Sequence, residues 1–512
     1  MKQTESAAFS GIRSFLWPIH SHEIKKIVPM VIMLALVALD YSILRNLKDA
    51  LVVTARGSGA EVIPFIKLWG MLPAAIVATM LFSYLLNRFS RAVVFQIIIL
   101  SFSAFFLIFC LFIYPNREAL HPNASADFLQ SVLPLGCKGL IAMYRNWTLT
   151  GFYIISELWG TIVLQVLMWG FANEVTKISE APRFYSVMVI ASNIAAFCAG
   201  QIAVALSYGE FDSNFAFGKD AWEQSLTKIL FLIVGLALIT LLTFWWMDRN
   251  VLSDPSYLPK DDEKSQKKVK KKLNFKESLV CIANSKYLLG IATIVISYNL
   301  VINLVEVIWK DRLRQLYPST VDYNIYINNL TSAMGIISTI ASVVMAGIIN
   351  RLGWTKTALL TPAVLMITTM AFFGCLFGGD AIAPIVSTVL GTTPLALAVL
   401  FGSVQNCFTK AAKYSVFDAT KEMAFIPLDR DERMKGKAAI DGIGSRMAKS
   451  GGSVIHQGLL LFFGTLSCSA PYVALIVIGA TTVWIVAVKA LGKEFSQFTK
   501  EHSEEPVAET VA

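Results

Sequence analysis

Apolar residues run in long stretches through most of this chain, and polar residues are concentrated in the short segments between them. A stretch of about 20 apolar residues is long enough to cross a bilayer as a helix. We therefore expect twelve membrane-spanning helices, arranged as two sets of six. The expected spans are 27–46, 62–87, 92–114, 147–171, 184–207 and 226–247, followed by 286–309, 323–349, 357–378, 387–409, 437–464 and 470–491.

The same pattern predicts five regions along the chain. These are a cytoplasmic N-terminal segment (1–26), an N-terminal six-helix bundle (27–247), a basic cytoplasmic linker (248–285), a C-terminal six-helix bundle (286–491) and a cytoplasmic C-terminal tail (492–512). The linker contains the basic run Lys264–Lys272, and the loops expected between spans nine and ten and between eleven and twelve contain no Lys or Arg. Because cytoplasmic loops are enriched in Lys and Arg, both termini are expected on the cytoplasmic side.

Two expected loops depart from this charge rule. They follow spans one and seven and carry basic residues on the side predicted to be external, namely Arg45, Lys48, Arg56, Lys310, Arg312 and Arg314. The sequence also repeats itself at these places, because Lys48-Asp-Ala-Leu follows span one and Lys310-Asp-Arg-Leu follows span seven. Asn87-Arg88 and Asn350-Arg351 repeat in the same order after spans two and eight. Two related six-helix halves are the arrangement of major-facilitator transporters, whose solute site lies between the halves near the middle of the membrane.

Span seven carries a polar stripe on an otherwise apolar helix. Asn299, Asn303, Glu306 and Lys310 are separated by four, three and four residues, which places them on one helical face. A carboxylate facing lipid costs roughly 2.5–3.5 kcal/mol on insertion scales. The stripe therefore must face protein or a water-filled path, and Glu306 is expected to mark a solute pathway.

Five charged residues lie within the expected spans: Lys67, Glu157, Glu306, Arg446 and Lys449. At about 3 kcal/mol each, five charges facing lipid would cost on the order of 15 kcal/mol, so they must line a common interior or pair with one another. Three cations against two carboxylates leave an excess of positive charge, which favours an anionic solute such as a phosphate compound. The alternative is that these residues form salt bridges that only hold the halves together.

Composition agrees with a polytopic membrane protein, because 55% of the 512 residues are hydrophobic and 15% are charged. The net charge of +9 comes from basic residues between the apolar runs, so no nucleic-acid partner is expected. The seven cysteines contain no CxxC pair, and neither a metal site nor a cofactor is expected. The Lys449-Ser450 segment lacks the spacing of a phosphate-binding P-loop, so an ATPase or a membrane hydrolase has no motif to support it.

At these residues the sequence closely resembles the non-mitochondrial ATP/ADP translocases of plastids and of obligate intracellular bacteria such as chlamydiae and rickettsiae. The similarity extends from about Asp40 to Lys493. It is carried by Ile43-Leu-Arg-Asn-Leu-Lys-Asp49, Ala60-Glu-Val-Ile-Pro-Phe-Ile-Lys67, Glu157-Leu-Trp-Gly160, Trp169-Gly-Phe-Ala-Asn173, Asn303-Leu-Val-Glu-Val307, Ala412-Lys-Tyr-Ser415, Ile426-Pro-Leu-Asp429, Lys435-Gly-Lys-Ala-Ala-Ile-Asp441 and Lys449-Ser-Gly-Gly452.

The resemblance implies that transport depends on Lys67, Glu157, Glu306 and Lys449. It also implies an antiporter, not an enzyme, that imports host ATP and exports ADP, with phosphate as a further cargo that accompanies ADP. The bacterial branch fits better, so we expect the bacterial inner membrane. A monomer is a separate expectation. Two alternatives stay open: a proton-coupled nucleotide or NAD importer of the same family, and a membrane scaffold or receptor that transports nothing.

For the exchange mechanism we expect Lys67 and Lys449, one from each half, to bind the phosphate chain. Arg446 is expected to assist from the same helix as Lys449. Glu157 and Glu306 would either accept hydrogen bonds from the adenine and ribose or pair with the lysines when the site is empty. Asn193 in span five is an additional expected polar contact.

Overall fold

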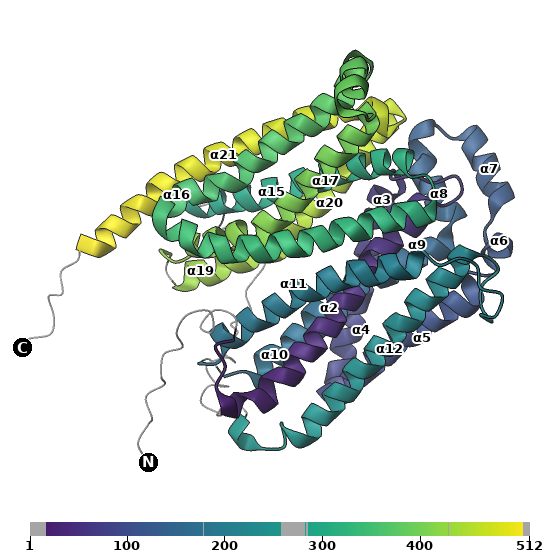
Figure 1. Ribbon diagram of the computed structural model, residues 1–512. Helices are drawn as coiled ribbons and strands as arrows, with labels where there is room; N and C mark the ends of the chain where they lie inside the picture. Colours follow the sequence, from purple (N-terminus) through teal and green to yellow (C-terminus); the bar gives the residue numbers. More distant parts are fainter. Residues whose placement is uncertain (1–16, 178, 258–281, 283–284, 429, 505–512) are drawn as a thin grey trace, which may run out of the picture.

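The computed structural model describes residues 17–177, 179–257, 282, 285–428 and 430–504. These residues form helices and connecting loops, with no β-strand among them. Two helical bundles lie side by side, one built from each half of the sequence (Figure 1). The protein is therefore an all-α polytopic protein, as the apolar pattern predicts. The linker run Lys264–Lys272 lies outside the described residues.

The first half is organised around α2, which packs against α9, α11 and α12. A hairpin of short helices separates its third and fourth long helices. The elements are η1 (Ser21–Glu23), α2 (Ile24–Val53), α3 (Val62–Phe65), η2 (Ile66–Met71), α4 (Leu72–Arg88), α5 (Arg91–Ile108), η3 (Phe109–Ile113), α6 (Arg117–Leu120), α7 (Asn123–Val132), η4 (Leu135–Cys137), α8 (Lys138–Arg145), α9 (Trp147–Leu158), η5 (Trp159–Met168), α10 (Trp169–Val175), α11 (Ala181–Ser207), α12 (Ala221–Asn250) and η6 (Pro255–Tyr257).

The second half is organised in the same way around α15, which packs against α17, α20 and α21. Its elements are α15 (Lys286–Leu316), α16 (Thr320–Leu390), α17 (Pro394–Ala412), η7 (Lys413–Phe417), α18 (Asp418–Ala424), α19 (Arg430–Lys437), η8 (Ala438–Gly444), α20 (Ser445–Phe463) and α21 (Leu466–Glu504). α16 is interrupted at Gly353 and Gly379, whose φ angles are 73° and 22°. Only glycine adopts such angles easily, so these two residues mark bends between separate helices.

Ten helices in the described part of the chain are long and apolar enough to cross a membrane. The expected spans 323–349 and 437–464 are helical but are not among these ten. The expected span 387–409 is displaced: the chain turns at Gly391, whose φ is 62°, and the membrane-length helix runs from Pro394 to Ala424. The first and seventh spans were predicted too short, because α2 continues to Val53 and α15 to Leu316.

Each half uses a buried indole to fix one pair of helices. In the first half, Trp159 Nε1 donates to the carbonyl oxygen of Val37 at 3.3 Å, and in the second, Trp309 Nε1 donates to that of Val399 at 3.2 Å. A side chain at Gly402 would collide with the Trp309 ring, so a glycine is required for the close approach of α17 to α15. These bonds hold the helices that carry the charged residues described below.

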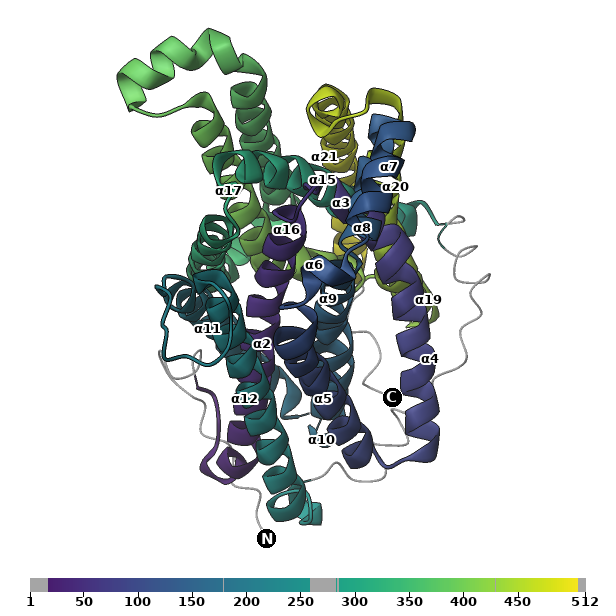
Figure 2. The same ribbon diagram turned by 90° about the vertical axis from the view of Figure 1, so that its right-hand side faces the viewer.

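Hydrogen bonds join the two halves at the end of the molecule away from the N-terminus. Thr54 follows the last residue of α2 and bonds to Thr320 at the start of α16, with the two hydroxyl oxygens 2.7 Å apart. Asn46 donates to Asn328 at 2.8 Å. Ser207, the last residue of α11, accepts from Asn324 at 3.0 Å. We call these three contacts the closed end; Figure 2 shows α2 running toward it from the end of the molecule that carries the N-terminus.

Candidate transport site

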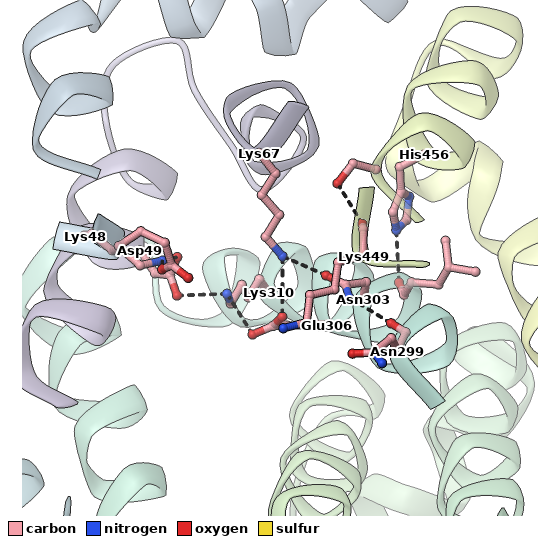
Figure 3. Close-up of polar contacts among 12 residues, drawn as sticks. Lys48, Asp49, Lys67, Asn299, Asn303, Glu306, Lys310, Lys449 and His456 are labelled. Carbon is pink, nitrogen blue, oxygen red and sulfur yellow. Dashed lines mark hydrogen bonds and ion pairs between the residues drawn. The ribbon is translucent and has the colours of Figure 1, made fainter. Parts of the chain in front are cut away.

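Lys67 of the first half meets the polar stripe of α15. Its Nζ donates to Asn303 Oδ1 at 2.9 Å and lies 3.8 Å from Glu306 Oε2 (Figure 3). Lys67 belongs to η2, a π-helical segment between α3 and α4. Such segments widen a helix by one residue per turn and are frequent at functional sites. The lysine and the glutamate singled out by their cost in a membrane are therefore brought together across the interface of the two halves.

The polar contacts continue from Glu306 into the first half through Lys310, the last residue of the polar stripe, and through two residues that were not predicted as site residues, Asp49 and Lys48. Glu306 Oε1 lies 3.0 Å from Lys310 Nζ, which in turn donates to Asp49 Oδ2 at 2.8 Å. Lys48 Nζ lies 3.1 Å from the other oxygen of Asp49 and 3.3 Å from Glu157 Oε2. We call the six residues Lys67, Glu306, Lys310, Asp49, Lys48 and Glu157 the ion network.

The ion network has an accessible part and a buried part. The side chains of Lys67, Glu306 and Glu157 are 27%, 19% and 34% exposed, whereas those of Lys48, Asp49 and Lys310 are each 4% exposed. Lys48 also lies over the ring of Tyr153, 3.7 Å from its centroid, which helps to offset its loss of water. A solute can therefore reach Lys67, Glu306 and Glu157, and the other three are enclosed.

The charges of the ion network balance, with three lysines against three carboxylates. The expected excess of positive charge therefore does not come from this network. Further cations lie around the network: Arg45 and Lys410 interact electrostatically with Glu306, and Lys449 on α20 projects toward Glu306. An anion can bind beside the network without leaving its carboxylates uncompensated.

Lys449 projects from α20 toward Asn303 and Glu306 on α15, and it is exposed (Figure 3). The two helices approach closely because Gly452, one turn further on, packs against Asn303. The neighbouring Ser453 hydroxyl donates to the carbonyl oxygen of Lys449 at 3.5 Å. The structure therefore places Lys449 on the same side of α15 as Lys67, although the two belong to different halves.

The two remaining expected site residues have different outcomes. Arg446 lies on α20, and its side chain is outside what the structure describes. Asn193 lies on α11, where its backbone packs against Gly335 of α16, on a different helix pair from the ion network. The structure thus brings together Lys67, Glu157, Glu306 and Lys449 and places Asn193 elsewhere along the interface of the halves.

Lys48 and Asp49 were not predicted as site residues because they were assigned to a loop, and Lys310 was placed on the polar face of span seven but was also counted with the loop that follows it. The departure of these loops from the positive-inside pattern was the available signal, because basic residues buried in a helix need not follow that rule. In the structure they lie in α2 and α15. Asp49 and Lys310 contact each other across the interface of the halves, whereas Lys48 contacts Asp49 and Glu157 within the first half.

Aromatic side chains near the network differ in accessibility. Trp159 and Tyr153 are buried, at 0% and 1%, and serve as packing residues. Trp69 is 61% exposed, and its Nε1 donates to Gln457 Oε1 of the second half at 3.1 Å. Within the described residues, no group of three or more His, Cys, Asp or Glu side chains is arranged to hold a metal ion.

A family model described as the TLC ATP/ADP transporter matches residues 2–495 of the chain. The chain belongs to this family. It is 41% identical over 497 residues to ADP,ATP carrier protein 1 of Chlamydia pneumoniae, covering 97% of this chain and 96% of that protein. It is 43% identical over 496 residues to the protein of the same name from Chlamydia trachomatis serovar D, covering 97% and 93%. A chloroplastic ADP,ATP carrier protein 2 of Arabidopsis thaliana is 39% identical, over 93% of this chain and 76% of that protein.

Solved structures of other transporters share the fold of this TLC family member. A bacterial homologue of the iron transporter ferroportin, in an inward-facing state, has a TM-score of 0.54 at 12% identity, covering 93% of this chain and all of the other. A D-xylose-proton symporter has a TM-score of 0.53 at 11% identity, covering 93% and 98%. These likenesses show the two-bundle transporter fold alone, because the identities are low.

Proposed function

We propose that this chain exchanges ATP for ADP across a bacterial cell membrane and that Lys67, Glu157, Glu306 and Lys449 contact the nucleotide. Membership of the TLC ATP/ADP transporter family supports the exchange, and the two chlamydial carriers support the bacterial setting. One observation carries the assignment of the site. Three residues of the ion network were predicted from sequence, Lys67, Glu157 and Glu306, and these are its three exposed members. Lys449, also predicted, is exposed beside them.

The roles follow from charge. Lys67 and Lys449, from opposite halves, bind phosphate oxygens as point charges, and Arg446 adds a further cation on the helix of Lys449. Glu306 and Glu157 neutralise Lys67 and Lys48 in the empty carrier. Nucleotide phosphates then replace Glu306 as the partner of Lys67. Phosphate itself carries the same recognition chemistry and is the proposed companion of ADP.

The exposed indole of Trp69 supports a place for the adenine base. It lies two residues from Lys67 in the same π-helical segment, and one edge is held by Gln457. We propose that the adenine stacks on this ring while its phosphates bind Lys67. Stacking on an aromatic face needs no base-specific hydrogen bond. Asn193 is retained as a polar contact further along the interface of the halves.

The structure has the two halves joined at one end, which supports alternating access. The hydrogen bonds of the closed end join the halves away from the N-terminus. We place both termini and the linker in the cytoplasm, so that the nucleotide site of this state communicates with the cytoplasm. The five regions 1–26, 27–247, 248–285, 286–491 and 492–512 are proposed to act as two moving bundles with flanking segments, in a monomer.

The deciding experiment uses purified full-length chain in lipid vesicles. Labelled ATP is added outside vesicles loaded with ADP, with phosphate, with ADP plus phosphate, or with buffer alone. We expect rapid uptake only with nucleotide inside, increased by phosphate if it travels with ADP. Lys67→Gln and Lys449→Gln should abolish uptake, while Lys25→Gln, an exposed lysine at the start of α2, should not. Full uptake by either site variant would refute the assignment of the site.

One observation favours proton-coupled import as a second candidate. Asp40 in the middle of α2 is 0% exposed, and within the described residues neither of its carboxylate oxygens has a hydrogen-bond partner. An ionised carboxylate without a partner is very costly in such a place, so an uncharged acid fits it better. If uptake into buffer-loaded vesicles followed an imposed pH gradient and Asp40→Asn removed that response, import would be proton-coupled. We expect neither result from an exchanger.

A further inference from the structure

Asp49 and Lys310 form an ion pair between the halves that is distinct from the exposed residues of the site. Their charged atoms are 2.8 Å apart, and both side chains are 4% exposed. They join α2 to α15, and Asp49 lies between Asn46 and Thr54, the two α2-side residues of the closed end. Separating this pair leaves Asp49 with Lys48 and Lys310 with Glu306, so each buried charge loses one of its two partners. Because a buried charge is poorly solvated, this contact opposes opening of the closed end.

Lys310 is shared between two carboxylates, and this sharing links the closed end to the site. It lies 2.8 Å from Asp49 and 3.0 Å from Glu306, which is one turn earlier on α15. Glu306 in turn is shared between Lys310 and Lys67. A change in the partner of Lys67 therefore alters how strongly Glu306 attracts Lys310, and thereby how strongly Lys310 holds Asp49.

We propose that Lys310 is a positioning residue that couples phosphate binding at Lys67 to release of Asp49. When nucleotide phosphates bind Lys67, Glu306 loses that lysine and draws Lys310 toward itself. Asp49 is then left to Lys48 alone, and the halves separate at the closed end. In the empty carrier Lys67 is paired with Glu306, Lys310 remains paired with Asp49, and the closed end does not open. This proposal rests on the proposed function and explains why the exchanger moves only when loaded.

Asp49→Asn tests the coupling directly, because it removes the pair and leaves Glu306, Lys67 and Lys310 in place. In lipid vesicles we expect labelled ATP to enter buffer-loaded vesicles about tenfold or more faster than with the unchanged chain, since the barrier from a buried ion pair is gone. The requirement for internal ADP should weaken accordingly. Asp311→Asn is the matched control, because Asp311 occupies the equivalent place in the second half but is bonded within its own helix, to Gln315.

The proposal is overturned if Asp49→Asn stays as dependent on internal ADP as the unchanged chain, or if Asp311→Asn loosens that dependence equally. If the unchanged chain shows no nucleotide-dependent uptake, the proposed function fails instead.

A second measurement does not depend on transport by the variants. Thr54→Cys with Thr320→Cys places two thiols where hydroxyl oxygens are 2.7 Å apart at the closed end. Oxidative cross-linking should be fast without nucleotide and several-fold slower with ADP. Added Asp49→Asn should slow it even without nucleotide. Equal cross-linking rates with and without the Asp49 change would also overturn the proposal.

Discussion

The exposed and buried parts of the ion network differ in what each charge can do. Lys67 is 27% exposed and donates to Asn303, so water or a solute can replace its protein partners. Lys48 is 4% exposed and is enclosed by Asp49, Glu157 and the Tyr153 ring. Both are lysines in the membrane-spanning part of the same half. The comparison shows that intramembrane position alone does not make a charge a ligand for cargo; accessibility separates a transport residue from a structural one.

The largest effect should come from the buried part. Lys48→Met keeps the length of the side chain but leaves Glu157 without its lysine and Asp49 with Lys310 alone. Because removing one member of a buried ion group costs about 3–5 kcal/mol, the free energy of unfolding should fall by about that amount. Denaturant titration of the purified chain in mild detergent measures this loss. A change below about 1 kcal/mol, as expected for an exposed pair, would erase the distinction between the two parts.

A change in the exposed part should reduce nucleotide affinity much more than stability. Lys67→Gln retains a donor to Asn303 but removes the charge that binds phosphate. Charge-assisted hydrogen bonds contribute about 1.5–3 kcal/mol, so nucleotide affinity should fall about 10- to 100-fold while the melting temperature changes little. Nucleotide-dependent thermal shift measures affinity and stability in the same sample. Loss of stability as large as that of Lys48→Met would mean that Lys67 is a structural residue too.

The exposed part could be predicted from sequence because the free-energy cost of placing a charge in lipid depends on that residue and its neighbours along the chain. A charge within an apolar run is expensive in lipid whatever its partners, and that argument found Lys67, Glu157 and Glu306. Lys449 was found in the same way, and the structure places it beside α15. The family resemblance pointed to the same four residues.

The buried part could not be predicted because it depends on pairing between helices far apart in sequence. Asp49 and Lys310 are separated by 261 positions and meet only when the halves pack together. The polar residues Arg45, Asn46, Lys48 and Asp49 ended the apolar run of the first span, although the helix itself continues to Val53. Helix ends are poorly marked by hydropathy where polar side chains are buried between protein surfaces, so Lys48 and Asp49 were assigned to a loop.

Glu157 tests the boundary between the two parts and should give the smallest effect. Its side chain is 34% exposed, yet its carboxylate lies 3.3 Å from buried Lys48. In Glu157→Gln, Lys48 keeps Asp49 and the Tyr153 ring, so the free energy of unfolding should fall by only about 0.5–1 kcal/mol, as for a partly exposed pair. Exchange should fall more than stability, because the residue also faces the solute. Denaturant titration and vesicle exchange on the same preparation measure both, with Glu118→Gln, an exposed glutamate outside the network, as the matched control. If the free energy of unfolding fell by several kcal/mol, Glu157 would behave like the buried residues. Side-chain exposure would then not distinguish transport residues from structural ones.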